Sequence, residues 1–340
     1  MDRVYLLGAG FSRAISNLMP TMDELSAAIQ HKLAGFDIPG ANTPVAANFE
    51  QWLSYLIERP PWLSPADQER NRAAFFDVAR AVYDVLSDHQ TRAVQSGEPP
   101  EWLQPLVVHW HATSATVITF NYDLFVELSW LRSLEEGDLQ WRRSLHLYPV
   151  PIAPISARVG HFIGGIPARN GLRLLKLHGS LSWRYSGPGS SAGDIVYDLG
   201  VLGTGWDLEG IRPLPVGYTD PYHLSVDREP MIVPPAAVKS PYYSNRTLQA
   251  LWRSAANVLR QAEELVIMGF SLPQTDLLVS SMLATTLRDD SVITPVDYGT
   301  KILDRVAETF DLKDLEGARI NSSFAGLKDD ALSAWVHGIA

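Results

Sequence analysis

The stretch Val4-Tyr5-Leu6-Leu7-Gly8-Ala9-Gly10-Phe11-Ser12 decides the fold class. A short continuous apolar run such as Val4 to Leu7 is typical of a strand buried on both faces of a parallel sheet. Glycines directly after it allow a tight turn into a helix, where backbone amides can approach a phosphate. We therefore expect a strand–loop–helix unit of an α/β protein. Its candidate ligand-binding residues are Gly8, Ala9, Gly10, Phe11 and Ser12.

The glycine loop alone leaves two interpretations open. A complete dinucleotide fingerprint has a third glycine where this chain has Arg13. An ordinary tight turn explains Gly8 and Gly10 equally well. Ser12 is either a phosphate donor or a helix cap.

Four more segments have the same continuous apolar character. They are Thr116–Phe120, Leu172–Leu177, Leu265–Met268 and Val292–Val296. Helical patterns with start signals alternate with them, at Thr21 to Leu33, Ser64 to Leu86, Ser244 to Ala262, Thr275 to Leu287 and Thr300 to Phe310. This alternation predicts a Rossmann-like α/β fold, a doubly wound parallel sheet covered on both faces.

Two segments interrupt the alternation of strands and helices. Residues of about 35–110 are helical with proline and tryptophan interruptions, and predict a helical insertion. Residues of about 185–243 are rich in Gly, Pro and Tyr, and predict either a small irregular subdomain or a lid. We expect one Rossmann-like domain over residues 1–340 that carries both insertions.

Composition narrows the classes of function. The chain is 46% hydrophobic and 19% charged, which is ordinary for a globular protein. Its formal net charge of −10 repels phosphate backbones, so we expect no direct nucleic-acid partner. The sequence has neither a signal-peptide pattern nor an apolar run of membrane-spanning length, so we expect a cytoplasmic protein without membrane contact. With no cysteine, disulfides, cysteine nucleophiles and thiolate zinc sites are excluded.

A polar motif follows the second predicted strand. In Thr119-Phe120-Asn121-Tyr122-Asp123, the side chains of Asn121 and Asp123 come directly after the apolar run. Ligands of open α/β sheets bind outside the carboxyl ends of the strands, so these side chains face the expected pocket. The alternative is that Asn121 turns the chain and Asp123 caps a helix beginning at Leu124.

A histidine motif, Lys176-Leu177-His178-Gly179-Ser180, follows the third strand. On a short loop at a strand end, His178 is placed to exchange a proton near neutral pH. The alternative is a surface or hydrogen-bonded histidine without a catalytic role.

The last two strands also end in candidate ligand-binding residues. In Met268-Gly269-Phe270-Ser271-Leu272 the strand–glycine–serine–helix order of the first loop is repeated, which predicts either a second phosphate-facing loop or a plain turn. Asp297 ends the fifth strand. It could hold ribose hydroxyls, or cap the helix at Thr300 to Phe310.

In this order, the motifs GAGFS, FNYD, LHGS and MGFSL and the acid-ended strand resemble those of the sirtuin family. That family has a Gly-Ala-Gly-x-Ser loop, an Asn-x-Asp motif, a catalytic His-Gly and a Gly-x-Ser loop. The resemblance implies that Gly8, Ala9, Gly10 and Ser12 cradle the NAD pyrophosphate, that Asn121 and Asp123 flank the nicotinamide and its ribose, and that His178 is the catalytic base. It also implies that Gly269 and Ser271 meet phosphate or the adenosine ribose, and that Asp297 meets the adenosine end.

Two departures from the family pattern bear on the activity. Sirtuin deacylases carry a zinc ribbon of cysteines after His-Gly, and this chain has no cysteine. The family's Pro-Asp-Phe-Arg stretch is also missing, and Pro20-Thr21-Met22 stands near its position. The pattern is therefore more similar to the zinc-free, NAD-degrading sirtuin-like effectors of bacterial anti-phage systems, Thoeris among them.

This resemblance implies an NAD hydrolase that needs no metal and releases nicotinamide and ADP-ribose, with Asn121, Asp123 and His178 as its catalytic residues. Three alternatives remain: an NAD or ADP-ribose sensor without turnover, an NAD-dependent protein deacylase, and a non-enzymatic assembly subunit. An unregulated NAD hydrolase would harm its own cell. We therefore expect a trigger, a homo-oligomer or a defence-system partner protein to control it.

Overall fold

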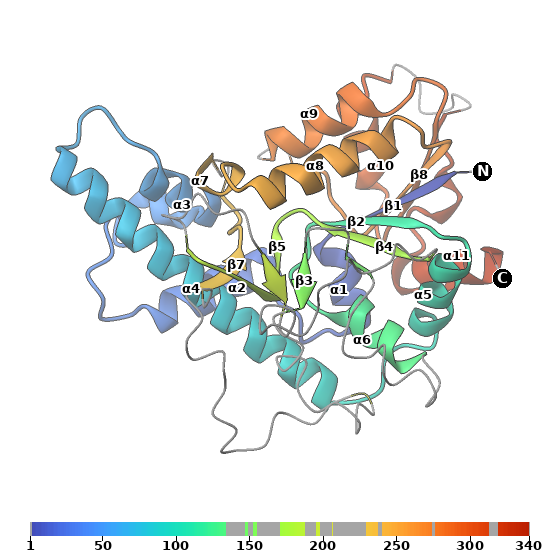
Figure 1. Ribbon diagram of the computed structural model, residues 1–340, viewed down its shortest axis with the longest axis horizontal. Coiled ribbons are helices and arrows are strands. Elements are labelled where there is room, and N and C mark those ends of the chain that lie inside the picture. Colours follow the sequence, from blue (N-terminus) through green and yellow to red (C-terminus); the bar gives the residue numbers. More distant parts are fainter. Residues whose placement is uncertain are drawn as a thin grey trace, which may run out of the picture.

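The computed structural model has a parallel five-stranded sheet at its centre, as the apolar runs predict (Figure 1). It describes residues 2–133, 147–148, 152–154, 171–187, 195–197, 206, 229–236, 240–273, 276–312 and 319–339. In spatial order the strands are β4 (Arg173–Lys176), β2 (Thr116–Thr119), β1 (Arg3–Leu7), β8 (Glu264–Met268) and β9 (Val292–Val296). Each matches one predicted strand to within two residues, and all pair in parallel.

The order of the strands in the sheet reverses at β1, which makes this the topological switch point of the fold. From β1 the chain extends the sheet through β2 and β4 on one side, and later through β8 and β9 on the other. Crossovers that start from neighbouring strands and run in opposite directions leave a crevice between their loops. The loops after β1 and β8 meet at this point. The doubly wound fold is thereby confirmed.

The register brings the carboxyl ends of all five strands to one level. Leu7 pairs with Thr119 and with Met268, and Thr119 pairs in turn with Lys176. Met268 pairs with Val296. Because paired residues lie side by side, the residues that follow each strand form a single edge of the sheet.

Helices cover both faces of the sheet. On one side lie α8 (Arg246–Leu259) and α9 (Leu277–Thr286), and on the other α1 (Ala9–Ile15), α5 (Leu103–Ala112) and α6 (Phe125–Arg132) (Figure 1). The capping signals explain several helix starts. Thr21 forms a capping box with Glu24 at the start of α2 (Met22–Lys32), where the sequence predicts a helix to begin, and Asn245 caps α8 by accepting two backbone hydrogen bonds.

The predicted helical insertion contains α3 (Phe49–Ile57), α4 (Pro65–Gln95) and the short η1 (Pro44–Ala47). With α2 these helices form a layer at the end of the molecule away from the chain termini (Figure 1). The cap at Ser64 and the proline at the first position of α4 are as predicted, but α4 continues past Leu86. Gln90, Ala93 and Val94 keep its inner face buried for two further turns, so the helix has no reason to stop at Leu86.

A second, smaller sheet connects this helical layer to the central sheet. Its spatial order is β3 (Ala153–Pro154), β6 (Val196–Tyr197), β5 (Gly179–Tyr185) and β7 (Glu229–Ile232), with β5 antiparallel to β6 and β7. The sequence patterns did not predict it. The segment 185–243, expected to be irregular, contributes β6, β7 and the short helix α7 (Ser240–Tyr243), and most of its remaining residues lie outside the described part of the chain.

The end of the chain packs along the outer strand β9. Ile320 bridges to Ile293 and Ala325 to Asp297, so residues 319–325 extend the sheet edge. The helices α10 (Lys301–Thr309) and α11 (Ala331–Ile339) and the short helices η6 (Ser322–Phe324) and η7 (Lys328–Asp330) surround this edge. No helix in the described part of the chain is long and apolar enough to cross a membrane.

Candidate active site

A cavity of about 740 Å³ opens at the carboxyl edge of the central sheet. Loops that follow all five of its strands contribute to the lining. The predicted site residues on this lining are Gly8, Ala9, Gly10, Ser12, Asn121, Asp123, His178, Gly269, Phe270, Ser271 and Asp297. Residues up to 289 positions apart in the sequence thus border one space, because the strand ends lie at one level.

Phe11 is the predicted ligand-binding residue that does not line the cavity. Its ring is buried and packs against Trp102 and Trp110, at centroid distances of 5.6 and 6.1 Å. Phe11 lies within α1, where the helical periodicity turns its side chain towards the sheet. It anchors the helix in the core, so the expectation that Phe11 contacts the ligand is wrong for its side chain.

The two glycine loops contact each other through their backbones. The amide of Gly10 donates to the carbonyl of Gly269 at 2.8 Å, and the amide of Gly8 donates to Met268 at 3.1 Å. A Cβ added to Gly8 would lie 2.5 Å from the Cα of Phe270, and one on Gly269 would lie 2.2 Å from the backbone nitrogen of Phe11. These glycines are therefore required for the close approach of the loops, whatever ligand binds there.

Asn121 is fixed by a bond to the first glycine loop. Its Nδ2 donates to the carbonyl oxygen of Gly8 at 2.7 Å, and its backbone amide donates to the Thr119 hydroxyl at 3.0 Å. A carbonyl oxygen only accepts, so this contact determines which end of the amide is Nδ2. The Oδ1 atom of Asn121 is left as the acceptor for a hydroxyl or water in the cavity.

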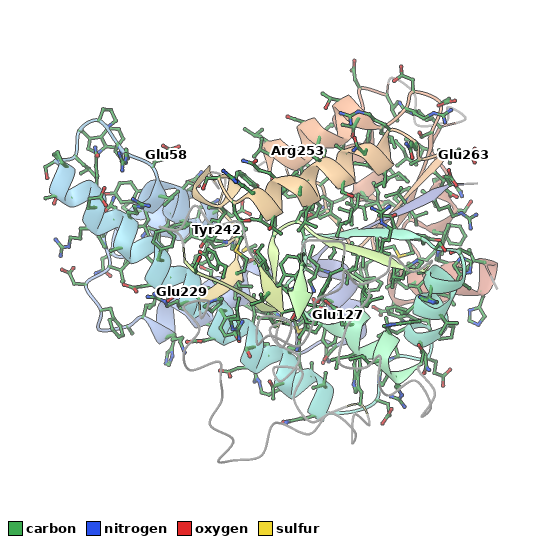
Figure 2. All side chains as sticks on the ribbon, viewed as in Figure 1. Glu58, Glu127, Glu229, Tyr242, Arg253 and Glu263 are labelled. Atoms are coloured by element: carbon green, nitrogen blue, oxygen red, sulfur yellow. The ribbon has the colours of Figure 1, made fainter. Side chains whose placement is uncertain are left out.

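Asp123 lies on the cavity floor and is held by a buried polar network. The hydroxyl of Ser12 donates to Oδ2 of Asp123 at 2.5 Å. Behind it, the ammonium of Lys176 donates to the Asp123 backbone carbonyl and to Oε1 of Glu127, the latter at 2.9 Å. The Lys176 and Glu127 side chains are 2% and 1% exposed, and Glu127 projects from α6 (Figure 2). Tyr148 completes the network by donating to Oε1 of Glu127 at 2.7 Å.

The contacts of Ser12 and Asp123 decide their alternative interpretations as helix caps. The N-cap of α1 is Gly8, so Ser12 is not a cap, and its hydroxyl supports Asp123. The N-cap of α6 is Leu124, without a side-chain capping bond, although Oδ1 of Asp123 accepts from the Phe125 amide at 3.3 Å. The amide of Leu124 is bound by the side chain of Gln90 on α4, which ties this loop to the helical insertion.

The carboxyl of Asp123 is less acidic than an exposed aspartate. Burial raises the pKa of Asp123, while the Lys176 ammonium and the Ser12 hydroxyl lower it in part. The neighbouring Glu127 carboxylate adds to the rise. The ionised form of Asp123 therefore depends on the positive charge of Lys176 and on the hydrogen bond from Ser12, so the buried network affects the charge of the cavity.

His178 occupies the junction of the two sheets, between β4 and β5. Its ring packs against Phe120 and Trp252, at centroid distances of 4.9 and 6.4 Å, and its Nε2 lies 3.8 Å from Oδ2 of Asp276. The next residue, Gly179, has a φ of 87°, and a Cβ there would lie 1.9 Å from the Met231 carbonyl oxygen. Only glycine permits this turn, so the His-Gly pair is a backbone requirement as well as a motif.

Asp297 lies beside the chain end on the other side of the cavity. Its Oδ1 accepts from the amide of Gly299 at 3.0 Å, and its carbonyl accepts from Gly326 at 3.0 Å. Burial raises the pKa of the Asp297 carboxyl. The N-cap of α10 is Thr300, so Asp297 does not cap that helix.

Several lining residues were not predicted from the sequence. The chain end contributes Lys328 and Asp329, the segment before α2 contributes Met19, Pro20 and Thr21, and Arg13, Glu50, Tyr122, Asp276 and Tyr298 also border the cavity. Lys328 has a φ of 54°, a conformation that costs energy in a residue with a Cβ. Of these, Asp276 had a visible signal, because it is an acidic residue shortly after the Gly269 loop at the end of a predicted strand.

The lining residues combine backbone, acidic and basic groups suited to a polar ligand. Arg13 and Lys328 supply positive charge, and Asp123, Asp276 and Asp297 supply carboxyl groups. No cluster of three or more histidine, aspartate or glutamate residues with metal-binding geometry occurs among the residues that the structure describes. A histidine, an amide and several carboxyl groups around one cavity can bind hydroxyls and transfer a proton.

No protein-family model and no curated protein matches the sequence. Among solved structures, the chain is similar to a Sir2 homologue in complex with NAD, with 13% sequence identity, a TM-score of 0.44, and coverage of 99% of this chain and 90% of that one. It is also similar to a structure described as a basis for the mechanism and regulation of Sir2 enzymes, with 13% identity, a TM-score of 0.40, and coverage of 99% and 91%.

Proposed function

We propose that this protein hydrolyses NAD at the bond between nicotinamide and ribose, and releases nicotinamide and ADP-ribose. The observation that carries the proposal is the shared position of Asn121, Asp123 and His178 on one cavity, together with both glycine loops and Asp297. The cavity volume of about 740 Å³ lies in the range of small-molecule sites. The order of the motifs in the sequence, which resembles that of sirtuins, supports NAD as the ligand.

The distribution of groups supports one orientation of NAD. The pyrophosphate would lie along the Gly8–Ser12 loop, with Arg13 on the same lining to balance its charge. The adenosine ribose would meet Asp297, and the nicotinamide ribose would meet Asn121 and His178. The reacting bond is then next to the polar groups of Asn121 and His178.

The chemistry needs little acid catalysis, because nicotinamide leaves from a cationic nitrogen as a neutral molecule. Its departure creates a ribose with oxocarbenium character, which the ionised Asp123 carboxylate stabilises. Oδ1 of Asn121 accepts a hydrogen bond from the attacking water or a ribose hydroxyl and so orients it. His178 accepts the proton that the nucleophile loses. The addition of one water per NAD+ thus yields nicotinamide, ADP-ribose and a proton.

Hydrolysis is a better account of these residues than deacylation. The zinc ribbon of sirtuin deacylases requires cysteines, and this chain has none. The resemblance to zinc-free sirtuin-like effectors suggests a place in anti-phage defence by NAD depletion. We infer that such an activity is controlled by an oligomer or by a partner protein.

The direct test is chromatographic measurement of nicotinamide released from NAD by the full chain, with Asn121→Ala and His178→Ala beside the wild type. We expect either substitution to lower turnover by about 10²- to 10⁴-fold, because each removes a group that acts on the nucleophile. Thermal melting should show that both variants fold, and calorimetry should show whether they bind NAD.

Each other outcome points to a different function. Binding of NAD without nicotinamide release, with or without a candidate partner, would identify a sensor and contradict the proposal. Release of acetyl-ADP-ribose from an acetylated peptide would identify a deacylase. Unchanged nicotinamide release by His178→Ala would remove His178 from the mechanism.

A further inference from the structure

Asp276 and His178 face each other across the cavity from different strands. Asp276 comes from the loop between β8 and α9, and His178 from the turn between β4 and β5. Oδ2 of Asp276 lies 3.8 Å from Nε2 of His178, and the two side chains are 13% and 7% exposed. Both residues line the cavity. A carboxylate this close to a shielded imidazole acts strongly on its charge.

The position of Asp276 at the start of a helix does not explain why its carboxylate lies beside His178. Asp276 is the N-cap of α9, where an aspartate ordinarily accepts a bond from a backbone amide of the first turn. Here the side chain makes no capping bond, although the N-caps Thr21, Asn48, Ser64 and Asn245 all do. The carboxylate lies on the His178 side instead, and the helix forgoes a stabilising contact.

Within the described part of the chain, other titratable groups near this pair come from three elements. Tyr122 and Asp123 belong to the loop after β2, Tyr243 to α7, and Lys176 to β4. Burial, with a smaller contribution from Asp276, raises the pKa of both Tyr122 and Tyr243, so these phenols stay neutral. Lys176 is occupied by Glu127 and by the Asp123 carbonyl. Phe120 and Trp252 cover the His178 ring with apolar surface.

We propose that Asp276 is a positioning residue for His178, holding the ring by its Nε2 edge and stabilising the imidazolium form. This proposal rests on the proposed NAD cleavage. As the oxygen of water bonds to the ribose carbon, the bond to nicotinamide breaks and its electron pair stays on the nicotinamide nitrogen. The proton of the water passes to His178, whose positive charge Asp276 balances, and then to solvent.

The first test measures the titration of His178 without NAD, so that it does not depend on activity. Histidines of the full chain are labelled with ¹⁵N, and the His178 signals are assigned by their loss in His178→Gln. In Asp276→Asn we expect the midpoint of the His178 titration to fall by about one pH unit or more, because the imidazolium loses its nearby negative charge. An identical midpoint in the wild type and in Asp276→Asn would overturn the proposal.

Asp304→Asn is the matched control for this titration. It makes the same change in net charge on the exposed face of α10 and away from the cavity lining. Its His178 midpoint should equal that of the wild type. An equal fall in both variants would mean that net charge, and not the pair, sets the titration, and would overturn the proposal.

The second test is the pH profile of nicotinamide release. His178 must be unprotonated to act as a base, so its titration sets the acid limb of kcat/KM. In Asp276→Asn this limb should move to lower pH, and turnover at neutral pH should fall at least about tenfold, with partial recovery in Asp276→Glu. A limb that stays in place would contradict the role of Asp276. If His178 titrates as expected but no variant releases nicotinamide, the pair stands and the proposed NAD cleavage is what fails.

Discussion

The cavity has two walls that are built on different physical principles. The glycine wall consists of Gly8, Gly10 and Gly269, and its shape comes from backbone atoms in close contact. The polar wall consists of Asn121, Asp123 and His178, and its character comes from side chains that are held by hydrogen bonds and charges. Both walls stand on adjacent strands of the same sheet.

This difference determines what a substitution in each wall changes. In the glycine wall any added atom meets backbone, so fold and ligand binding are lost together. In the polar wall a truncated side chain leaves the backbone in place, so chemistry can be lost while the fold remains. The exception is the support of the polar wall, Lys176 and Glu127, whose charges are buried as deeply as any apolar core residue.

The largest loss of unfolding free energy is expected from Lys176→Met. The substitution leaves the Glu127 carboxylate in the protein interior without its cation, and breaking one partner of a buried ion pair costs about 3–5 kcal/mol of unfolding free energy. Urea denaturation of the wild type and the variant at neutral pH measures this loss. Breaking the buried ion pair behind the polar wall would then destabilise the protein at least as much as disturbing the backbone packing of the glycine wall.

The matched control for Lys176→Met is the double variant Lys176→Met with Glu127→Gln. It removes both charges and keeps an oxygen that can accept from Tyr148. We expect it to recover most of the lost stability. A single variant that loses less than about 1 kcal/mol would show that Glu127 does not depend on the ammonium, and would contradict this account of the network.

A smaller loss of stability is expected from Gly269→Ala in the glycine wall. Gly269 has a φ of 59°, and its Cβ would lie 2.2 Å from the backbone nitrogen of Phe11. The left-handed conformation and the forced separation of the loops together should cost about 2–3 kcal/mol. Thermal melting and NAD calorimetry should show lower stability and weaker binding in the same variant.

Gly299→Ala serves as the control for Gly269→Ala. It makes the same chemical change in a loop after β9, where a Cβ would meet no atom within 4 Å. We expect its stability to differ from that of the wild type by less than about 0.5 kcal/mol. Equal losses in both variants would mean that the loop contact at Gly269 is not what makes glycine necessary there.

The sequence was sufficient to predict the sheet and the edge of the sheet at which the cavity lies. Five continuous apolar runs mark strands buried on both faces, and each predicted run is a strand of the parallel sheet. Since parallel strands end at one edge, motifs at their carboxyl ends had to meet, however far apart they lie in the chain. This position made Asn121, Asp123 and His178 candidates, and the resemblance to the sirtuin motifs assigned their roles.

The sequence was not sufficient to predict how the walls are supported. The contact between Gly10 and Gly269 could not be predicted, because nothing in the local sequence distinguishes a glycine that faces another loop from one that faces a ligand. Lys176 was part of the strand pattern as an isolated charge, and its partner Glu127 lies on a helix 49 positions earlier. Pairs that form only in three dimensions leave no periodic signal.

The second sheet and the lining from the chain end escaped prediction for a related reason. Strands β3 and β6 have two residues each, too few for any alternation to be detected. Lys328 and Asp329 reach the cavity because residues 319–325 extend the edge of β9, and no motif in that segment indicates this. Their sequence is that of an ordinary polar turn.

The smallest of the three effects concerns Asp123 and depends on pH. Burial raises its folded-state pKa above the unfolded value of about 3.9, so between these two values the folded protein binds more protons than the unfolded one. The unfolding free energy of the wild type therefore falls as the pH rises through this window, and stays at the lower level above it. Asp123→Asn lacks this contribution, because its amide does not ionise.

Unfolding free energies measured in urea from about pH 4 to about pH 7 should show this difference. Relative to the wild type, the unfolding free energy of Asp123→Asn should rise by up to about 1.4 kcal/mol for each pH unit in the window between the two pKa values. Above that window the difference between the two proteins should stay constant. Asp304→Asn, exposed on α10, should give a curve parallel to that of the wild type. If the curve of Asp123→Asn is also parallel to that of the wild type, the Asp123 carboxyl has the same pKa in the folded and unfolded states. Burial would then not penalise its ionisation, and this account of the polar wall would be contradicted.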